Sequence, residues 1–141
     1  MRMVCPYCLL NAELIDSAAV YGRSYGMIWL CQPCQAWVGV HKGSKDHKPL
    51  GTLAREELRK SRQLAHKELD PHWQVLMEQG HKKGVARQLI YAKLATEMGV
   101  DVKSCHIAQF DERSCSMVVS ICARWRKAAA EAAADQLETR S

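Results

Sequence analysis

Residues 5–8 read CPYC and residues 31–34 read CQPC, so two copies of Cys-x-x-Cys stand 22 residues apart. A Cys-x-x-Cys turn can place two thiolates on one metal ion, at a Zn–S distance of about 2.3 Å, and two such turns complete a tetrahedron. The segment between them has to leave the ion and return to it, as an antiparallel hairpin does. The spacing therefore predicts a zinc ribbon in which one structural Zn²⁺ is bound by Cys5, Cys8, Cys31 and Cys34.

Two other interpretations of these turns are weaker. A single Cys-x-x-Cys is also the motif of a thioredoxin-like redox pair, but that site requires a βαβ pattern, which the surrounding sequence does not show. Four thiolates can hold an iron–sulfur cluster, although zinc is preferred for two turns on one short hairpin. With four thiolate ligands the zinc has no open position for catalysis, so its expected role is to fold a small segment.

The composition limits the class of protein. The chain has 141 residues, of which 48% are hydrophobic and 25% charged, which is enough for one modest core. The start, MRMVCPYC, lacks the apolar run of a signal peptide, and no stretch of about 18 apolar residues is present. We therefore expect a cytoplasmic protein without a membrane partner. In that reducing compartment, the seven cysteines are better explained by four ligands and three other thiols than by disulfides.

The net charge of +5 is mildly basic and unevenly distributed. Residues 1–51 carry five basic and three acidic side chains, residues 52–99 carry nine and six, and residues 100–141 carry six and six. Four thiolates on one zinc ion would reduce the net charge to about +3. An excess of this size permits nucleic-acid binding but does not require it.

The residue pattern changes near residue 51. Before it we expect strands at 12–20, 27–30 and 36–40, a turn at 21–26 and a basic loop at 41–51. After it we expect a helix over 53–69 capped by Thr52, a break at Asp70-Pro71, and helices over 72–79, over 85–98 ending at Gly99, and from about Asp111.

The expected fold class is α+β. Residues 1–51 are predicted to form the zinc-ribbon β-hairpin, packed on a three- to four-helix bundle of residues 52–127. An Ala-rich helical extension with a frayed tail is expected over residues 128–141, because this segment has little to bury.

The remaining cysteines and histidines do not form a pattern typical of a metal site or a catalytic site. Cys105 and His106 are adjacent, which is a poor spacing for a second metal site with Cys115. Cys115 and Cys122 lie seven residues apart on one helix face and are better explained as small core residues. The sequence contains no Gly-rich phosphate loop and no nucleophile elbow, so no catalytic residue and no small-molecule substrate are predicted.

Two loops of the predicted ribbon suit nucleic acid. The hairpin tip, YGRSYG, alternates aromatic rings with a guanidinium, and both can stack on unpaired bases. The following loop and the next helix supply cations and histidines for phosphates. The predicted contact residues are Tyr21, Arg23, Tyr25, His41, Lys42, Lys45, Lys48, Arg55 and Arg59. In the alternative interpretation, the tyrosines pack on a small sheet and the charged residues form an ordinary solvated face.

Several stretches together resemble a known family. They are CPYC, WLCQPCQAWVGVHKGS, KPLGTLAREELRKSRQLAHKELDPHW, ARQLIYAKLATEMGV and CHIAQFDERSC. From about residue 5 to residue 115 the chain resembles the zinc-finger-containing family of unknown function that is common in bacteriophages, prophages and mobile elements. The resemblance implies a pair of zinc knuckles joined to a helical domain, and no activity. It further implies one shared scaffold that includes Gly39, His41, Gly51, Leu53, Ala54, His66, Asp70, Trp73, Cys105, His106 and Cys115.

Three functions are consistent with the sequence. The preferred hypothesis is a non-catalytic zinc-binding recognition protein that contacts DNA or RNA through the basic, aromatic edge of the ribbon. The alternative, motivated by the resemblance, is a phage-type inhibitor or adaptor that binds a host nucleic-acid machine, such as a CRISPR defence complex or a polymerase, in the bacterial cytosol. A small nuclease that uses His41 or His106 is the least favoured hypothesis.

Overall fold

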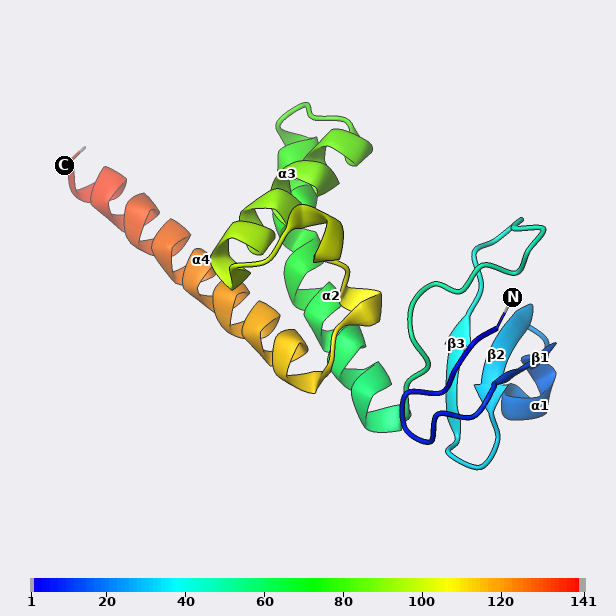
Figure 1. Ribbon diagram of the computed structural model, residues 1–141. Helices are drawn as coiled ribbons and strands as arrows, with labels where there is room; N and C mark the ends of the chain where they lie inside the picture. Colours follow the sequence, from blue (N-terminus) through cyan, green and yellow to red (C-terminus); the bar gives the residue numbers. More distant parts are fainter. Residues whose placement is uncertain (1, 140–141) are drawn as a thin grey trace. The chain divides into compact units, whose positions relative to one another are not determined.

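The computed structural model describes residues 2–139 and divides into two compact units, Met1–Lys60 and Ser61–Ser141. The first unit holds a three-stranded antiparallel sheet and the four-cysteine cluster, and the second is helical (Figure 1). The predicted α+β class is therefore confirmed. The boundary expected at residue 51 and the packing of the ribbon on the helical bundle stay predictions.

The sheet of the first unit has the strand order β1-β2-β3. Its strands are β1 (Glu13–Asp16), β2 (Met27–Cys31) and β3 (Ala36–Gly39). Both neighbouring pairs are antiparallel, and side chains alternate across the pleat. Trp29, Cys31 and Val38 share the face that forms the core, and Ile28 on the opposite face is also buried. The core of this unit consists of Cys5, Ala12, Trp29, Cys31, Ala36, Val38 and Leu53.

The first predicted strand is too long. Instead of continuing to residue 20, β1 ends at Asp16, and a single helical turn, α1 (Ala18–Tyr21), follows. The Asp16 carboxylate accepts a hydrogen bond from the backbone N–H of Ala18 at 2.9 Å. An aspartate that bonds to the backbone two residues further on forms a local turn, which competes with continuation of a strand.

Two predictions about the first long helix are wrong, because α2 spans Glu56–Glu78 without a break. Thr52 does not start it, since Ala54 is still extended and exchanges backbone hydrogen bonds of 3.0 and 3.1 Å with Trp37. Pro71 lies inside the helix on an exposed side, while Leu69 and Trp73 on either side of it are buried in one core. That packing outweighs the cost of an internal proline, which is about 3 kcal/mol.

The rest of the second unit begins with α3 (Lys83–Met98), which ends as predicted at Gly99, whose φ of 71° is left-handed. Two short 3₁₀ turns follow, η1 (Val102–Ser104) and η2 (Ile107–Gln109), and then α4 (Glu112–Thr139). The Asp111 carboxylate accepts a hydrogen bond from the N–H of Ser114 at 2.8 Å, so Asp111 caps α4 near the predicted start.

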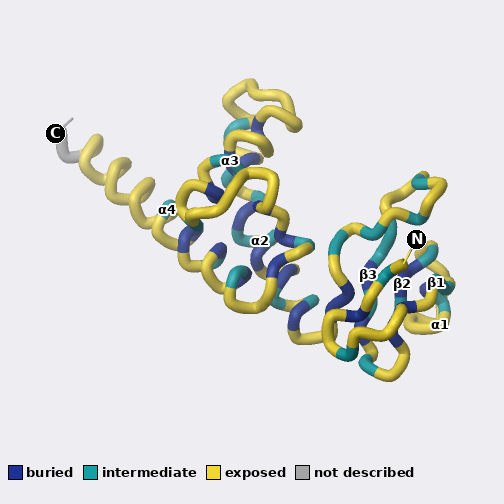
Figure 2. Tube along the Cα trace, in the orientation of Figure 1, coloured by how far each residue is buried: buried dark blue, intermediate teal, exposed yellow. Residues whose placement is uncertain are grey.

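The core of the second unit lies among α2, α3 and the first part of α4, as the dark segments in Figure 2 show. Val118, Ile121 and Cys122 of α4 are buried, whereas Met117 is 38% exposed. Residues 127–137 are all exposed and helical, as expected for the Ala-rich helical extension (Figure 2). The end of the predicted frayed tail, residues 140–141, lies outside the described residues. Of the helices described in residues 2–139, none has the length and apolarity needed to cross a membrane.

Candidate functional site

The structure brings the four predicted ligands together. The sulfur atoms of Cys5, Cys8, Cys31 and Cys34 all lie within 4.8 Å of one another. The Cys8 and Cys31 sulfurs are 3.6 Å apart, close to the roughly 3.8 Å that separates two sulfurs on a tetrahedral zinc ion with 2.3 Å bonds. All four are free thiols. This donor set fits one structural Zn²⁺, which confirms the predicted cofactor.

Each pair of cysteines is presented by a tight knuckle. In the first, Cys5 donates its N–H to the carbonyl of Leu10 and accepts from the N–H of Leu9, both at 2.8 Å. The second knuckle connects the end of β2 to the start of β3. In both, the residue after the second cysteine is left-handed, with φ of 65° at Leu9 and 53° at Gln35. The two turns share this left-handed residue, and both cysteine pairs meet in one cluster.

The four cysteine ligands differ in how far they are buried. Cys5 and Cys31 are buried in the core of the unit, while Cys8 and Cys34 are half-buried. The N–H of Cys34 lowers the pKa of Cys31, but burial and the neighbouring thiols together outweigh it and raise this pKa to about 12. A bound divalent cation reverses this balance, because a coordinating thiol is deprotonated. Burial of Cys31 therefore disfavours a free thiolate at that position, and a bound cation would favour it.

Arg55, one of the predicted contact residues, lies beside this cluster. Its guanidinium lies 4.4 Å from the centroid of the Tyr7 ring, and its backbone N–H donates to the Tyr7 hydroxyl at 3.2 Å. Burial is the main effect on Cys34 and raises its pKa, whereas the Arg55 side chain lowers it. The positive charge of Arg55 therefore faces a thiolate ligand, where it offsets part of the negative charge of a four-thiolate zinc site.

A second feature of the first unit is a groove of about 890 Å³ beside the hairpin tip. Its lining includes four of the predicted contact residues, namely Tyr21, Tyr25, His41 and Lys42. It also includes Trp37 and His47, which are not among the predicted contact residues. The alternation along β3 indicates where Trp37 lies. Its neighbours Ala36 and Val38 are buried, so Trp37 points to the opposite face of the sheet.

The aromatic rings of the groove are in direct contact. Tyr21 lies between Tyr25 and Trp37, with ring centroids 5.5 Å apart and edge-to-face geometry in both pairs. Tyr25 remains 70% exposed and Tyr21 51% exposed. The guanidinium of Arg23 lies 5.7 Å from the Tyr25 ring centroid. The hairpin tip therefore presents a connected set of rings with open surface and a cation beside it.

The tip is held by the almost fully buried Ser17. Its hydroxyl oxygen accepts a hydrogen bond from the N–H of Tyr25 at 2.7 Å, and its own N–H donates to the carbonyl of Gly26 at 2.9 Å. Asp16 accepts from the Ser24 hydroxyl at 3.0 Å. The hydrogen bond from the Ala18 N–H is the main reason that the pKa of Asp16 lies below its usual value, and the bond from the Ser24 hydroxyl is the second. These bonds set the position of the backbone that carries the exposed Tyr25 ring.

The basic loop of residues 41–48 forms the other wall of the groove and is itself a closed hairpin. The N–H of His41 donates to the carbonyl of Lys48 at 2.8 Å, and the N–H of Lys48 donates to the Ser44 hydroxyl at 3.0 Å. The Trp29 indole N–H donates to the carbonyl of His47 at 2.9 Å, which fastens the loop to the sheet. Three exposed lysines, at positions 42, 45 and 48, stand in this loop against one acid, Asp46.

Arg59 is engaged within the first unit. Its guanidinium lies 4.6 Å from the Trp37 ring centroid and donates a hydrogen bond to the carbonyl of Ala54. It is half-buried, unlike Lys42, Lys45 and Lys48. Arg59 therefore braces one wall of the groove, and Lys42 is the exposed lysine in its lining.

The cysteines of the second unit lie in its core. Cys105, Cys115 and Cys122 are each at most 1% exposed, and burial raises the pKa of each thiol, that of Cys122 to about 11. Within residues 2–139, the four-cysteine group of the first unit is the only cluster of three or more potential metal ligands. His106 is exposed. A second metal site at Cys105, His106 and Cys115 is therefore not formed there, and the core interpretation of Cys115 and Cys122 agrees with their burial.

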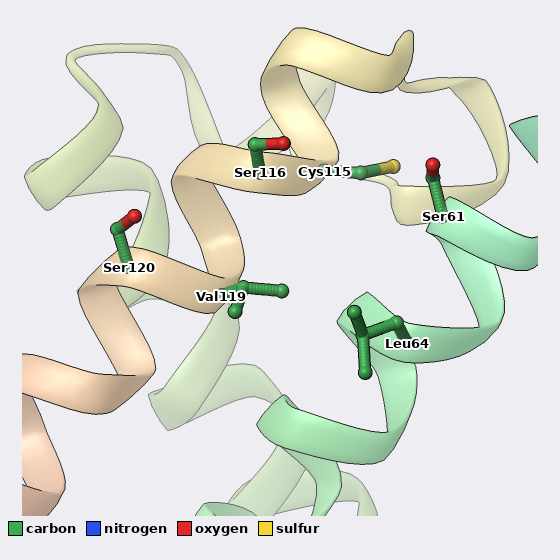
Figure 3. Close-up of a pocket in the computed structure, with 6 residues that line it drawn as sticks. All are labelled: Ser61, Leu64, Cys115, Ser116, Val119 and Ser120. Atoms are coloured by element: carbon green, nitrogen blue, oxygen red, sulfur yellow. The ribbon is translucent and has the colours of Figure 1, made fainter.

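A small pocket of about 250 Å³ opens in the second unit between α2 and α4. Figure 3 shows Leu64 of α2 and Val119 of α4 pointing toward one another across it. Its other lining residues are Ser61, Cys115, Ser116 and Ser120, so none of the six is an acid or a histidine. Burial raises the pKa of the Cys115 thiol, which works against its activation as a nucleophile.

Comparison with known proteins agrees with the zinc site. A family model described as a zinc-finger-containing domain matches residues 1–135. Searches of curated proteins and of solved structures gave no match. The matched segment covers nearly the whole chain, including all four cysteines of the cluster. The chain therefore belongs to the family of zinc-finger-containing domains.

Proposed function

We propose that the protein is a non-catalytic zinc-binding module that recognises nucleic acid through the groove and the basic loop of its first unit. The observation that carries this proposal is the grouping of Tyr21, Tyr25 and Trp37 with Lys42 around one groove. Aromatic rings stack on bases and lysines bind phosphates, so this combination suits a nucleic acid. A site with four thiolate ligands needs reduced cysteines, which fits the expected cytoplasmic location.

No catalytic residue is part of the proposal. Four thiolates leave a zinc ion without a position for water or substrate, so the ion holds the ribbon together. The groove and the loop would then provide binding alone.

The test is the salt dependence of binding. Binding of a fluorescently labelled 20-nucleotide DNA strand is measured by anisotropy over a series of salt concentrations. Each phosphate contact contributes about −0.7 to the slope of log K against log salt for a single strand. Replacing Lys42, Lys45 and Lys48 together by alanine should weaken binding and reduce the steepness of that slope by about 2.

The matched control replaces three exposed lysines of the second unit by alanine, namely Lys67, Lys82 and Lys103. Both triple variants change the net charge equally. The control should bind as the unaltered protein does. Equal weakening in both variants, or binding that does not depend on salt, would show that the basic loop is not the contact surface.

A protein partner is the second candidate function. The first knuckle exposes apolar side chains next to the zinc site, with exposed fractions of 48% at Val4, 76% at Leu9 and 62% at Leu10. The phage and mobile-element setting implied by the sequence resemblance points to a host nucleic-acid machine, such as a defence complex or a polymerase, as the target of an inhibitor or adaptor. This surface supports binding of such a protein independently of the groove.

This candidate is tested by affinity capture from a nuclease-treated bacterial lysate. A specific complex should survive the nuclease and be lost when Leu9 and Leu10 are both replaced by serine. The triple lysine variant serves as the control and should still capture the partner. A complex that disappears with nuclease, or that persists in the serine variant, would argue against docking at this knuckle.

A further inference from the structure

The exposed Tyr25 ring points to a more specific ligand, an inference that rests on the proposed function. We infer that the groove takes an unpaired base of a single-stranded nucleic acid, stacked on Tyr25, while neighbouring phosphates of the strand lie on Lys42 and the basic loop. The strand, rather than a duplex, is the ligand.

The rings give the first reason. Tyr25 lines the groove and is 70% exposed, although Tyr21 contacts it edge to face and the Arg23 guanidinium lies 5.7 Å from its ring centroid. Its ring therefore has open surface directed at a space large enough for a nucleotide. Inside a duplex both faces of each base are covered by neighbouring bases, so away from duplex ends an unpaired base is needed to cover this ring.

The backbone around Tyr25 gives the second reason. The N–H of Tyr25 is bound to the hydroxyl of the buried Ser17, and the neighbouring Gly26 carbonyl accepts from the Ser17 N–H. The ring is thus exposed on a backbone that is already fixed. A fixed aromatic platform loses little conformational freedom when a base binds, which favours stacking.

The charge distribution gives the third reason and selects a strand over a free nucleotide. Lys42 lines the groove, while Lys45 and Lys48 continue along the loop beyond its lining. All three are exposed, and Asp46 is the one acid among residues 41–48. A free nucleotide would use the cation at the groove alone. A strand that leaves the groove along the loop places further phosphates near the remaining lysines.

The decisive experiment compares three ligands of equal length on the unaltered, zinc-loaded protein at one salt concentration. They are a 20-nucleotide DNA strand of mixed sequence, its duplex, and a strand with the same phosphates in which every nucleotide is abasic. The base-containing strand should bind at least about five-fold more tightly than either of the others, since stacking one base on an aromatic ring contributes about that factor or more.

Two variants locate the effect at the ring. Tyr25→Leu keeps an apolar side chain but removes the aromatic face, and should weaken binding of the base-containing strand at least about five-fold. Tyr25→Phe keeps the face and should bind within about two-fold of the unaltered protein, since a phenylalanine ring also stacks on bases. Neither variant should change binding of the abasic strand, and each should retain one zinc per chain.

The outcomes separate this inference from the proposed function. Equal affinity for the abasic and base-containing strands overturns the inference, as does equal weakening by Tyr25→Phe and Tyr25→Leu. If binding still depends on salt and on the loop lysines in those cases, the proposed function stands without base stacking. If no strand and no duplex binds, both are overturned. If a mononucleotide competes as well as the strand does, the ligand is a free nucleotide and not a strand, which also overturns the inference.

Discussion

At the scale of single residues, the two zinc knuckles share an unusual backbone conformation. Leu9 and Gln35 each follow the second cysteine of a knuckle, and each has a positive φ. An L-residue in the left-handed region is destabilised by roughly 1–2 kcal/mol. The 76% exposed side chain of Leu9 makes little packing contact that would compensate. The zinc knuckle therefore keeps Leu9 in this strained conformation, and a substitution at Leu9 should relieve the strain.

Replacing Leu9 by glycine should stabilise the zinc-loaded protein by up to about 1 kcal/mol, because relief of the left-handed strain exceeds the greater chain entropy of glycine. Urea unfolding of the zinc-loaded protein measures this change. Leu10→Gly, at an exposed position without positive φ, is the matched control and should destabilise the protein slightly. A loss of stability in both variants would mean that strain at Leu9 is not released by glycine.

The cap of α4 makes a pH-dependent prediction. The Ser114 backbone N–H is the main cause of the lowered pKa of Asp111 in the folded protein. A carboxyl group with a depressed folded-state pKa contributes stability above its unfolded value and loses that contribution as the pH falls. Asp111→Ala should therefore destabilise the protein by about 1 kcal/mol at pH 7.

This difference between the unaltered protein and Asp111→Ala should shrink as the pH falls below about 4, where the unfolded aspartate titrates. Thermal unfolding at pH 7 and at several pH values below 4 measures it. A Ser116→Ala variant, at an exposed position of the same helix, should show no such pH dependence. A constant difference over this pH range would contradict the cap.

At the scale of elements, the sequence predicts best where a local interaction determines the structure. The two Cys-x-x-Cys turns, the stop at Gly99 and the start near Asp111 all depend on a few adjacent residues. Two predictions about α2 were wrong because distant contacts decide, and the predicted first strand was too long because the local turn at Asp16 was not recognised. Ala54 is kept extended by pairing with Trp37, and α2 continues through Pro71 because buried residues lie on both sides of it.

The same distinction applies to the candidate site. Residue type and spacing were enough to predict the four cysteines and to select Tyr21, Tyr25, His41 and Lys42. The shape of the groove depends on the register of β3 against its neighbours, which determines where Trp37 lies. The anchoring of the basic loop depends on a bond from Trp29 to His47, 18 residues away along the chain, and no local pattern indicates such a contact.

The uninterrupted α2 makes an element-level prediction. Pro71 has no N–H to donate to the fourth carbonyl before it, and its ring crowds that carbonyl. Pro71→Ala should therefore raise the free energy of unfolding, by about 1–3 kcal/mol. Urea unfolding followed by circular dichroism measures this change. If the alanine variant is instead less stable, the proline itself must support the local geometry of the helix.

At the scale of the whole molecule, each compact unit has its own core. The core of the first unit contains Cys5 and Cys31, whereas that of the second is built from helices and three non-ligand cysteines. Because ligand thiols are part of the first core, metal binding and folding are coupled in that unit. The second core includes no zinc ligand.

Removal of zinc should therefore affect the two units differently. After treatment with a strong chelator, the tertiary signals of Trp29 and Trp37 should be lost, while most of the helical circular dichroism signal should remain. Cys31→Ser should behave like the chelated protein, and Cys122→Ala should keep its zinc. Loss of helix in proportion to zinc would contradict this expectation and would mean that the helical unit also depends on the ion.

The exposed end of α4 has a practical consequence. Residues 127–137 extend the helix by about 16 Å, since an α-helix rises about 1.5 Å per residue, and each of them is exposed. A fluorophore, spin label or affinity tag attached near this end is carried on a short rod, away from the buried side chains of the second unit. Such a label allows distances to be measured from this end of α4, and such a tag allows the protein to be attached to a solid support. Neither modifies a residue of the two cores or of the zinc cluster.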